Sequence, residues 1–225
     1  MQLLRRLYNW AKIGHNPAGA GAVTMFRETT RDRFVQPGEL PALFKAINDE
    51  QTNPLIRDFL KVALYTGARR SNVAAMREDE INADAATWTV PGLKSKSGES
   101  MILYLSAEAM AIIEQRMGHE SGFIFPGRGK SGHFMEPKAT WKDILTRAGL
   151  KNLHLHDLRR TLGSFQAAIG SSLRVIGRSL GHRSTSATAI YARVNLDPVR
   201  ESVNAATAAI VAAVNKKPGN AKKAK

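Results

Sequence analysis

The chain contains His156-Asp157-Leu158-Arg159, followed by Leu180-Gly181-His182 and then by Tyr191. These segments supply imidazole, guanidinium and phenol groups, all of which can bind or attack a phosphodiester. His156 and Arg159 are three residues apart, so on a helix both project from one face. Tyr191 follows His182 by nine residues, at the end of the short stretch 184–190. This order and spacing predict a site for phosphodiester chemistry.

A further arginine lies upstream in Thr66-Gly67-Ala68-Arg69, where an apolar helix is expected to end at the glycine. A phosphodiester resists cleavage because its charge repels nucleophiles and its alkoxide is a poor leaving group. Cations on the nonbridging oxygens reduce this barrier, and arginine suits that task without a metal because its forked donors match two oxygens. We therefore expect Arg69 and Arg159 to hold the phosphate.

Tyr191 is the expected nucleophile. A phenol has a pKa of about 10 and is mostly protonated at neutral pH, so it needs a base and cations nearby. His156 can accept its proton, and His182 can donate a hydrogen bond to the phosphate. The other three tyrosines are less suited, because they lie in the leading helix, an apolar run and a strand. This chemistry requires no cofactor and no metal ion.

The acid for the leaving oxygen is expected on the turn of a β-hairpin, formed by the strand-like segments 87–90 and 101–105. Lys96 lies on this turn and can reach a leaving 5′ oxygen. Lys94 is the competitor, because it lies two residues away on the same strand face.

Two other motifs indicate a function less strongly. His154 and His156 form a His-x-His pattern that zinc sites also use, but neither a cysteine nor an obvious third ligand accompanies it. Gly129-Lys130-Ser131 lacks the first glycine of a phosphate loop, because Ile124 stands in that place.

The charge of the chain favours a polyanionic partner. Its formal net charge is +14 over 225 residues. Five lysines lie in the last ten residues, and +9 remains without them (14 − 5 = 9). Nucleic acid is the leading partner for such a basic protein. The chain has no cysteine and no run of 18 apolar residues, so we expect a cytosolic protein without disulfides or a membrane span.

Apolar periodicity predicts a mainly helical chain with one small antiparallel β-sheet, an α+β fold. A leading helix is expected to end before His15-Asn16-Pro17, and an asparagine-capped helix should begin at Asn53-Pro54. Phe123-Ile124-Phe125 is expected to be briefly extended. The other expected helices span 36–48, 106–117, 138–148, 156–169, 171–180, 184–192 and 197–214.

Together these motifs resemble the tyrosine recombinase (phage integrase) family over about 33–214, the extent of its catalytic domain. The resemblance implies that Arg69, Lys96, His156, Arg159 and His182 assist catalysis and that Tyr191 is the nucleophile. Counted from the second strand, the family's spacing favours Lys96 over Lys94. The resemblance also implies site-specific cleavage and rejoining of duplex DNA through a 3′-phosphotyrosine, by a tetramer on DNA. The C-terminal helix would link its protomers, and accessory DNA-bending proteins are further partners of such enzymes.

The resemblance also predicts a domain organisation. Residues 1–32 read as the remnant of an N-terminal core-binding domain plus linker, 33–214 as the catalytic domain, and 215–225 as a basic, disordered tail. Without the rest of a DNA clamp, we expect DNA binding to be weak and to fall steeply with salt. The expected location is the bacterial cytoplasm, associated with the nucleoid. The alternatives are a non-catalytic DNA-binding remnant of an integrase, a topoisomerase that only relaxes DNA, and an RNA-binding basic protein.

One departure from the family's pattern is Asn72, which stands three residues after Arg69 where an acidic residue is usual. An amide can still accept a hydrogen bond but carries no charge. We therefore expect Asn72 to retain the ordering role of that acid.

Replacing Asn72 with alanine is expected to slow DNA cleavage, because the amide that orders the site is lost. Cleavage of a nicked duplex measures the effect. An unchanged rate would contradict an ordering role for Asn72.

Overall fold

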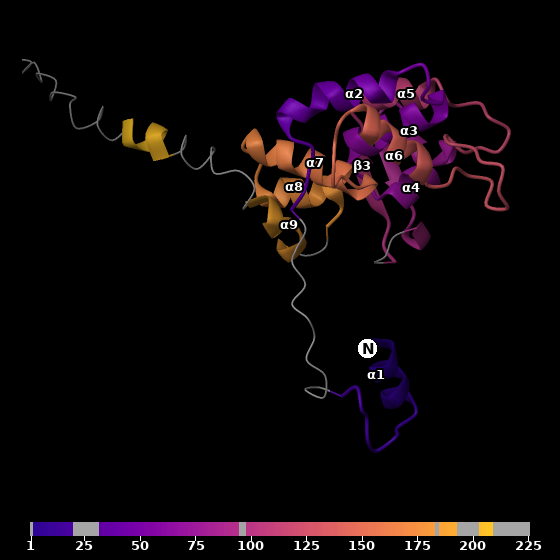
Figure 1. The fold of residues 1–225 in the computed structure, drawn as a ribbon, viewed down its shortest axis with the longest axis vertical. Helices are drawn as coiled ribbons and strands as arrows, with labels where there is room; N and C mark the ends of the chain where they lie inside the picture. Colours follow the sequence, from indigo (N-terminus) through magenta and orange to yellow (C-terminus); the bar gives the residue numbers. More distant parts are fainter. Residues whose placement is uncertain (1, 20–31, 95–97, 183–184, 193–202, 209–225) are drawn as a thin grey trace, which may run out of the picture. The chain divides into compact units, whose positions relative to one another are not determined.

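The computed structural model describes residues 2–19, 32–94, 98–182, 185–192 and 203–208 (Figure 1). The chain divides into two compact units, Met1–Arg31 and Asp32–Lys225. In the smaller unit α1 (Gln2–Trp10) is followed by a turn, and Nε of Arg5 donates to the carbonyl of Ala18 at 2.6 Å across it. The described site residues all belong to the larger unit.

The first helices of the larger unit form where the sequence predicts them. A 3₁₀ turn, η1 (Pro37–Glu39), continues into α2 (Leu40–Asn48), and α3 spans Pro54–Thr66. Asn53 caps α3 as expected, because its Oδ1 accepts a hydrogen bond from the backbone N–H of Leu55 at 2.8 Å. Gly67 ends α3 in the left-handed conformation, with φ of 57°.

The sheet has three antiparallel strands in the order β1 (Ile81–Asn82), β2 (Thr87–Val90) and β3 (Met101–Tyr104). Trp88 pairs with Leu103 and both side chains are buried, whereas the next pair, Thr89 with Ile102, is exposed. One face of the sheet therefore packs on the core. The sequence predicted the hairpin of β2 and β3 but missed β1, because two residues show no alternating pattern.

The remaining helices follow the predicted order, with one addition. The short helix α4 (Arg70–Ala74) was not expected, because five residues are too few to display a helical period. Of the expected C-terminal helix, residues 203–208 are helical, while its other residues and the tail 215–225 lie outside the described residues. The other helices are α5 (Ala107–Glu114), α6 (Lys138–Arg147), α7 (Leu155–Ala168), α8 (Leu173–Leu180) and α9 (Thr185–Ala192).

Two clusters of buried side chains hold the larger unit together. The main core contains Phe59 of α3, Trp88 of β2 and Leu158 of α7. A smaller cluster joins Ile176 and Leu180 of α8 to Tyr191 of α9. Helix α7 packs against α3 and also against α8 and α9, which lie together beside it (Figure 1). The chain is thus mainly helical with a small antiparallel sheet, as predicted.

None of the helices in the described residues has the length and apolar character that crossing a membrane demands.

Candidate active site

Arg159 links the start of α7 to the turn that follows α3. Its Nη1 donates to the carbonyl of Gly67 at 2.7 Å, and the residue is 4% exposed. A cation is favourable at this point, because the last carbonyls of a helix carry partial negative charge. The same turn leads directly into Arg69, which precedes α4 and is partly buried. One hydrogen bond therefore brings the segments of the two candidate arginines together.

Gly67 allows this close approach for two reasons. Its positive φ is a conformation that side chains rarely adopt, and a Cβ at this position would lie 2.6 Å from Leu180 and 2.9 Å from Leu162. The end of α3 is therefore in contact with both α7 and α8.

Asp157 fixes the beginning of α7. Its carboxylate is completely buried, and it accepts hydrogen bonds from the backbone N–H of His154 and from Nη1 of Arg160, both at 2.7 Å. A carboxylate in the first turn also interacts favourably with the helix dipole. With the helix start fixed in this way, Arg159 points inward while His156 stays at the surface.

His182 is placed by the end of α8. Gly181 adopts the left-handed conformation with φ of 64°, and the backbone N–H of His182 bonds to the carbonyl of Gly177 at 2.7 Å. The imidazole then lies parallel to the phenol ring of Tyr191, with ring centres 6.3 Å apart and planes 8° apart. The two side chains are therefore neighbours, although nine residues separate them in the sequence.

Tyr191 is 2% exposed and rests on α7. A Cβ at Gly163 would lie 2.5 Å from Cζ of its ring, so only glycine fits below it. The adjoining cavity, lined by Arg160 and Ile190 among others, has a volume of about 10 Å³. That space is about what a single water molecule requires, roughly 10–15 Å³, and is too small for a phosphate group.

Burial and neighbouring charges shift the acid–base properties of the site. Desolvation lowers the pKa of Arg159 to about 10; the Tyr191 phenol opposes the shift and the Arg69 charge adds to it. Arg159 therefore remains a cation at neutral pH. Burial raises the pKa of Tyr191, which the charges of Arg159 and Arg160 partly offset.

Both histidines favour the neutral form. Desolvation, assisted by Arg159, Arg69 and His156, lowers the pKa of His182 to about 4. Desolvation also lowers the pKa of His156, and the charges of Arg159, Arg160 and Arg70 add to this effect. A neutral imidazole has one nitrogen that donates and one that accepts, so each histidine can move or hold one proton at neutral pH.

The structure brings together five of the six residues that the sequence singled out. Arg69, His156, Arg159, His182 and Tyr191 interact electrostatically with one another, directly or through Arg159. The sixth, Lys96, lies outside the described residues. Its competitor Lys94 donates to the carbonyl of Ala75 at 2.6 Å and forms an ion pair with Glu80, which anchors the base of the hairpin.

Asn72 is buried in α4 with 3% exposure. Its Nδ2 makes no hydrogen bond within the described residues, which is costly for a buried donor. Its role in ordering the site stays a prediction. No group of three His, Asp or Glu side chains in the described part of the chain is arranged to hold a metal ion.

Three supporting residues were not predicted from the sequence: Asp157, Gly163 and Thr188, whose Oγ1 lies 3.0 Å from Nδ1 of His182. Asp157 was quoted only as part of a motif, and nothing local marks Gly163 as a contact of Tyr191. Thr188 could have been found, because it lies three residues before Tyr191 and therefore on the same helix face.

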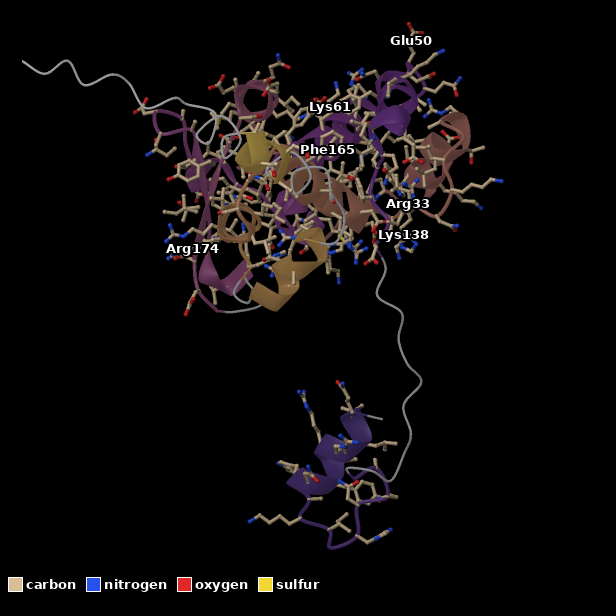
Figure 2. The ribbon with its side chains drawn as sticks, turned by 90° about the vertical axis from the view of Figure 1, so that its left-hand side faces the viewer. Arg33, Glu50, Lys61, Lys138, Phe165 and Arg174 are labelled. Carbon is tan, nitrogen blue, oxygen red and sulfur yellow. The ribbon has the colours of Figure 1, made fainter. Side chains whose placement is uncertain are left out.

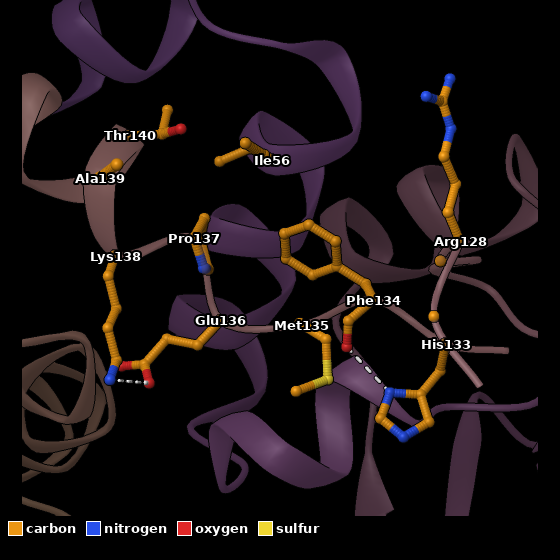
Figure 3. Close-up of a pocket in the computed structure, with 12 residues that line it drawn as sticks. Ile56, Arg128, His133, Phe134, Met135, Glu136, Pro137, Lys138, Ala139 and Thr140 are labelled. Carbon is orange, nitrogen blue, oxygen red and sulfur yellow. Dashed lines mark hydrogen bonds and ion pairs between the residues drawn. The ribbon is translucent and has the colours of Figure 1, made fainter. Parts of the chain in front are cut away.

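Two adjoining hollows of the described surface do not include Tyr191 in their lining. One of about 420 Å³ is formed by 127–140 together with Ile56 of α3 (Figure 3). A second, of about 300 Å³, shares His133–Glu136 with it and reaches Arg70 of α4, which forms an ion pair with Glu136. The second hollow borders α4 through Arg70, Ser71 and Ala74, and neither hollow is lined by any of the five described candidate residues.

The scaffold, mainly helical with a small three-stranded antiparallel sheet, is that of an integrase catalytic domain. The model of the Phage integrase family matches residues 33–197, and the chain belongs to this family. The family resemblance drawn from the motifs is thereby confirmed.

Relatives and solved structures agree with this assignment. The chain is 28% identical to prophage integrase IntF of Escherichia coli (strain K12) over 177 residues, which cover 76% of this chain and 37% of IntF. The catalytic domain of bacteriophage HP1 integrase has a similar fold, with a TM-score of 0.56 and 20% identity over 76% of this chain and 93% of that one. XerH site-specific recombinase bound to its difH substrate gives a TM-score of 0.62 at 15% identity, over 83% of this chain and 59% of that one. The chain spans 37% and 66% of the length of the first two curated relatives.

Replacing Gly163 with alanine is expected to displace the Tyr191 ring, because the new Cβ would overlap it. The displaced phenol loses part of its burial, so its pKa should fall towards the ordinary value of about 10. Near-ultraviolet titration, with the signal of a Tyr191→Phe chain subtracted, measures this pKa. Gly38→Ala is the control, since nothing lies within 4 Å of a Cβ there. An unshifted titration in Gly163→Ala would contradict the packing.

The depressed pKa of His182 predicts that the folded chain loses stability as pH falls from about 6.5 to about 4. Over this range the unfolded chain binds a proton at His182 and the folded chain does not, so protonation favours unfolding. Thermal unfolding of the parent and of His182→Gln should show a weaker pH dependence in the variant. His119→Gln is the control, because that exposed ring contacts Ser121 and lies outside the site. If the unfolding temperatures of the parent and of His182→Gln depended equally on pH, the lowered pKa of His182 would be contradicted.

Proposed function

We propose that this chain is the catalytic part of a site-specific DNA recombinase that cleaves and rejoins duplex DNA through a 3′-phosphotyrosine. The observation that carries the proposal is the parallel arrangement of His182 and Tyr191 beside the buried cation Arg159. A phenol, a neutral imidazole and a fixed guanidinium supply a nucleophile, a donor to phosphate and a charge clamp.

In the proposed reaction the phenol oxygen of Tyr191 attacks the phosphorus of one DNA strand. His156 accepts the phenol proton, and the bond from phosphorus to the 5′ oxygen breaks. The leaving oxygen takes a proton from Lys96 and becomes a free 5′-hydroxyl. The strand stays joined to Tyr191 through its 3′ phosphate, and the reverse reaction with a new 5′-hydroxyl rejoins DNA without ATP.

Arg69 and Arg159 would hold the nonbridging oxygens throughout this exchange. Negative charge builds up on these oxygens as the phenol attacks, and fixed cations that need no reorganisation stabilise it. Loss of one such donor typically slows catalysis by about 10²–10³. The arginines thus take the part that metal ions take in other phosphodiester enzymes.

The neutral histidines support these assignments. An imidazole that is already protonated cannot accept the phenol proton, and the lowered pKa of His156 keeps it available as a base. Because Tyr191 is buried, DNA binding must shift α9 or its surroundings before the phenol reaches a phosphate.

Duplex DNA is the proposed partner. The net charge of +14 suits a polyanion, and basic side chains such as Arg174 and Lys138 project from different sides of the larger unit (Figure 2). XerH, whose fold is similar, was solved bound to its difH substrate, and the Tn1549 transposon integrase was solved in complex with a circular intermediate DNA. Assembly as a tetramer through the C-terminal helix is part of the same proposal, as is the division into a core-binding remnant (1–32), a catalytic domain (33–214) and a tail.

A second candidate function is DNA binding without cleavage. Asn72 favours it, because an uncharged side chain, whose Nδ2 has no hydrogen-bond partner among the described residues, occupies the place where an acidic residue is usual. The two functions differ only in whether Tyr191 becomes joined to DNA.

The distinguishing prediction is a covalent protein–DNA adduct that survives SDS, forms in EDTA and disappears in Tyr191→Phe. The chain would be incubated with supercoiled plasmid and with nicked duplexes drawn from DNA that flanks its gene. Tyr104→Phe is a matched control, because that tyrosine lies exposed on β3 and should leave the adduct intact. Salt-sensitive binding without any adduct would favour the non-catalytic function.

A further inference from the structure

His182 is held by the helix that carries Tyr191. Oγ1 of Thr188 lies 3.0 Å from Nδ1 of His182, and Thr188 is 2% exposed. A buried hydroxyl needs a partner within the protein, because water cannot supply one. Thr188 and Tyr191 are three residues apart in α9, so they occupy the same face of that helix. This face therefore carries the proposed nucleophile and also binds the imidazole beside it.

Helix α8 leaves room for Thr188. A Cβ at Gly177 would lie 3.0 Å from Oγ1 of Thr188, which is tighter than an ordinary contact. Glycine destabilises the interior of a helix. The close contact between α8 and Thr188 of α9 explains why glycine nevertheless stands at position 177. The carbonyl of Gly177 also accepts the backbone N–H of His182 at 2.7 Å. The backbone of His182 is thus fixed by α8 and its ring by α9.

The hydrogen bond to Thr188 leaves Nε2 of His182 for another partner. A neutral imidazole carries its hydrogen on one nitrogen only, whereas a threonine hydroxyl can both donate and accept. Phosphate oxygens only accept hydrogen bonds, so a nitrogen that faces phosphate must carry the hydrogen. In that tautomer Nδ1 is an acceptor, and the hydroxyl of Thr188 must be the donor.

We propose that Thr188 is a positioning residue that donates to Nδ1 of His182 and thereby holds the imidazole in its Nε2–H form. This inference rests on the proposed function for the phosphate that Nε2 faces. It implies that the packing of α9 against α8 both positions Tyr191 and fixes the tautomer of His182. The usual effect of such supporting hydrogen bonds in enzymes is to fix ring orientation and tautomer.

The experiment measures the His182 tautomer in the full chain, labelled with nitrogen-15 histidine, at neutral pH. His182→Gln assigns the resonances, because one imidazole pair disappears. In the parent chain the Nε2 shift should be that of a protonated nitrogen and the Nδ1 shift that of a bare one. Thr188→Val, of similar shape but without the hydroxyl, should move both shifts towards a mixture. Thr188→Ser should keep the parent pattern.

A matched control is Thr146→Val. Oγ1 of Thr146 donates to the carbonyl of Lys142 at 3.0 Å, and this hydrogen bond lies on the exposed face of α6. Removing it should therefore leave the His182 signals unaltered. A hydrogen on Nδ1 in the parent chain would overturn the proposal, and so would an unchanged tautomer in Thr188→Val. The parent spectrum decides the tautomer by itself, even if Thr188→Val does not fold.

Activity gives an independent readout. Thr188→Val should form the covalent DNA adduct about tenfold more slowly at unchanged DNA affinity, and Thr188→Ser should restore the rate. Equal rates in the parent and Thr188→Val would contradict the positioning role. If the parent forms no adduct at all, the proposed function fails, whereas the spectra still decide whether Thr188 holds the Nε2–H form.

Discussion

The buried hydrogen bond from Arg159 to the carbonyl of Gly67 is the interaction on which the site depends. A guanidinium loses its hydration when it is buried, and the loss is tolerable only where other groups take over its hydrogen bonds. The end of α3 provides a carbonyl with partial negative charge at this point. The contact fixes α7 against α3 and brings Arg69 into the same neighbourhood. Glycine at position 67 is essential to it, for its positive φ and for the space it leaves to Leu162 and Leu180.

This cation also contributes to the electrostatics of its neighbours. Desolvation lowers the pKa values of both histidines and the charge of Arg159 adds to that shift, whereas the same charge opposes the rise that burial imposes on the pKa of Tyr191. The site is therefore positive through its arginines while its imidazoles stay neutral. Such a division suits phosphate transfer, because fixed charge binds the phosphate oxygens while uncharged groups move protons.

The sequence predicted the helices and the hairpin because each depends on a local pattern, whereas the grouping of the candidate site residues was expected from the family resemblance. Asn53 and Gly67 mark the ends of α3 by their own chemistry, and the motif around Arg159 lies on one helix face. Contacts between helices were not predictable in this way. The space that Gly163 leaves for Tyr191 and the bond from Thr188 to His182 depend on how α7, α8 and α9 pack. The segments α4 and β1 were missed because they are too short to repeat an apolar pattern.

The proposed reaction is defined by the atom of the protein that becomes joined to DNA. After cleavage of a duplex, nuclease trimming and proteolysis would leave a nucleotide remnant on one peptide, which mass spectrometry can locate. We predict a remnant linked through its 3′ phosphate to the peptide that contains Tyr191. A remnant on another residue, or one linked through a 5′ phosphate, would contradict the account.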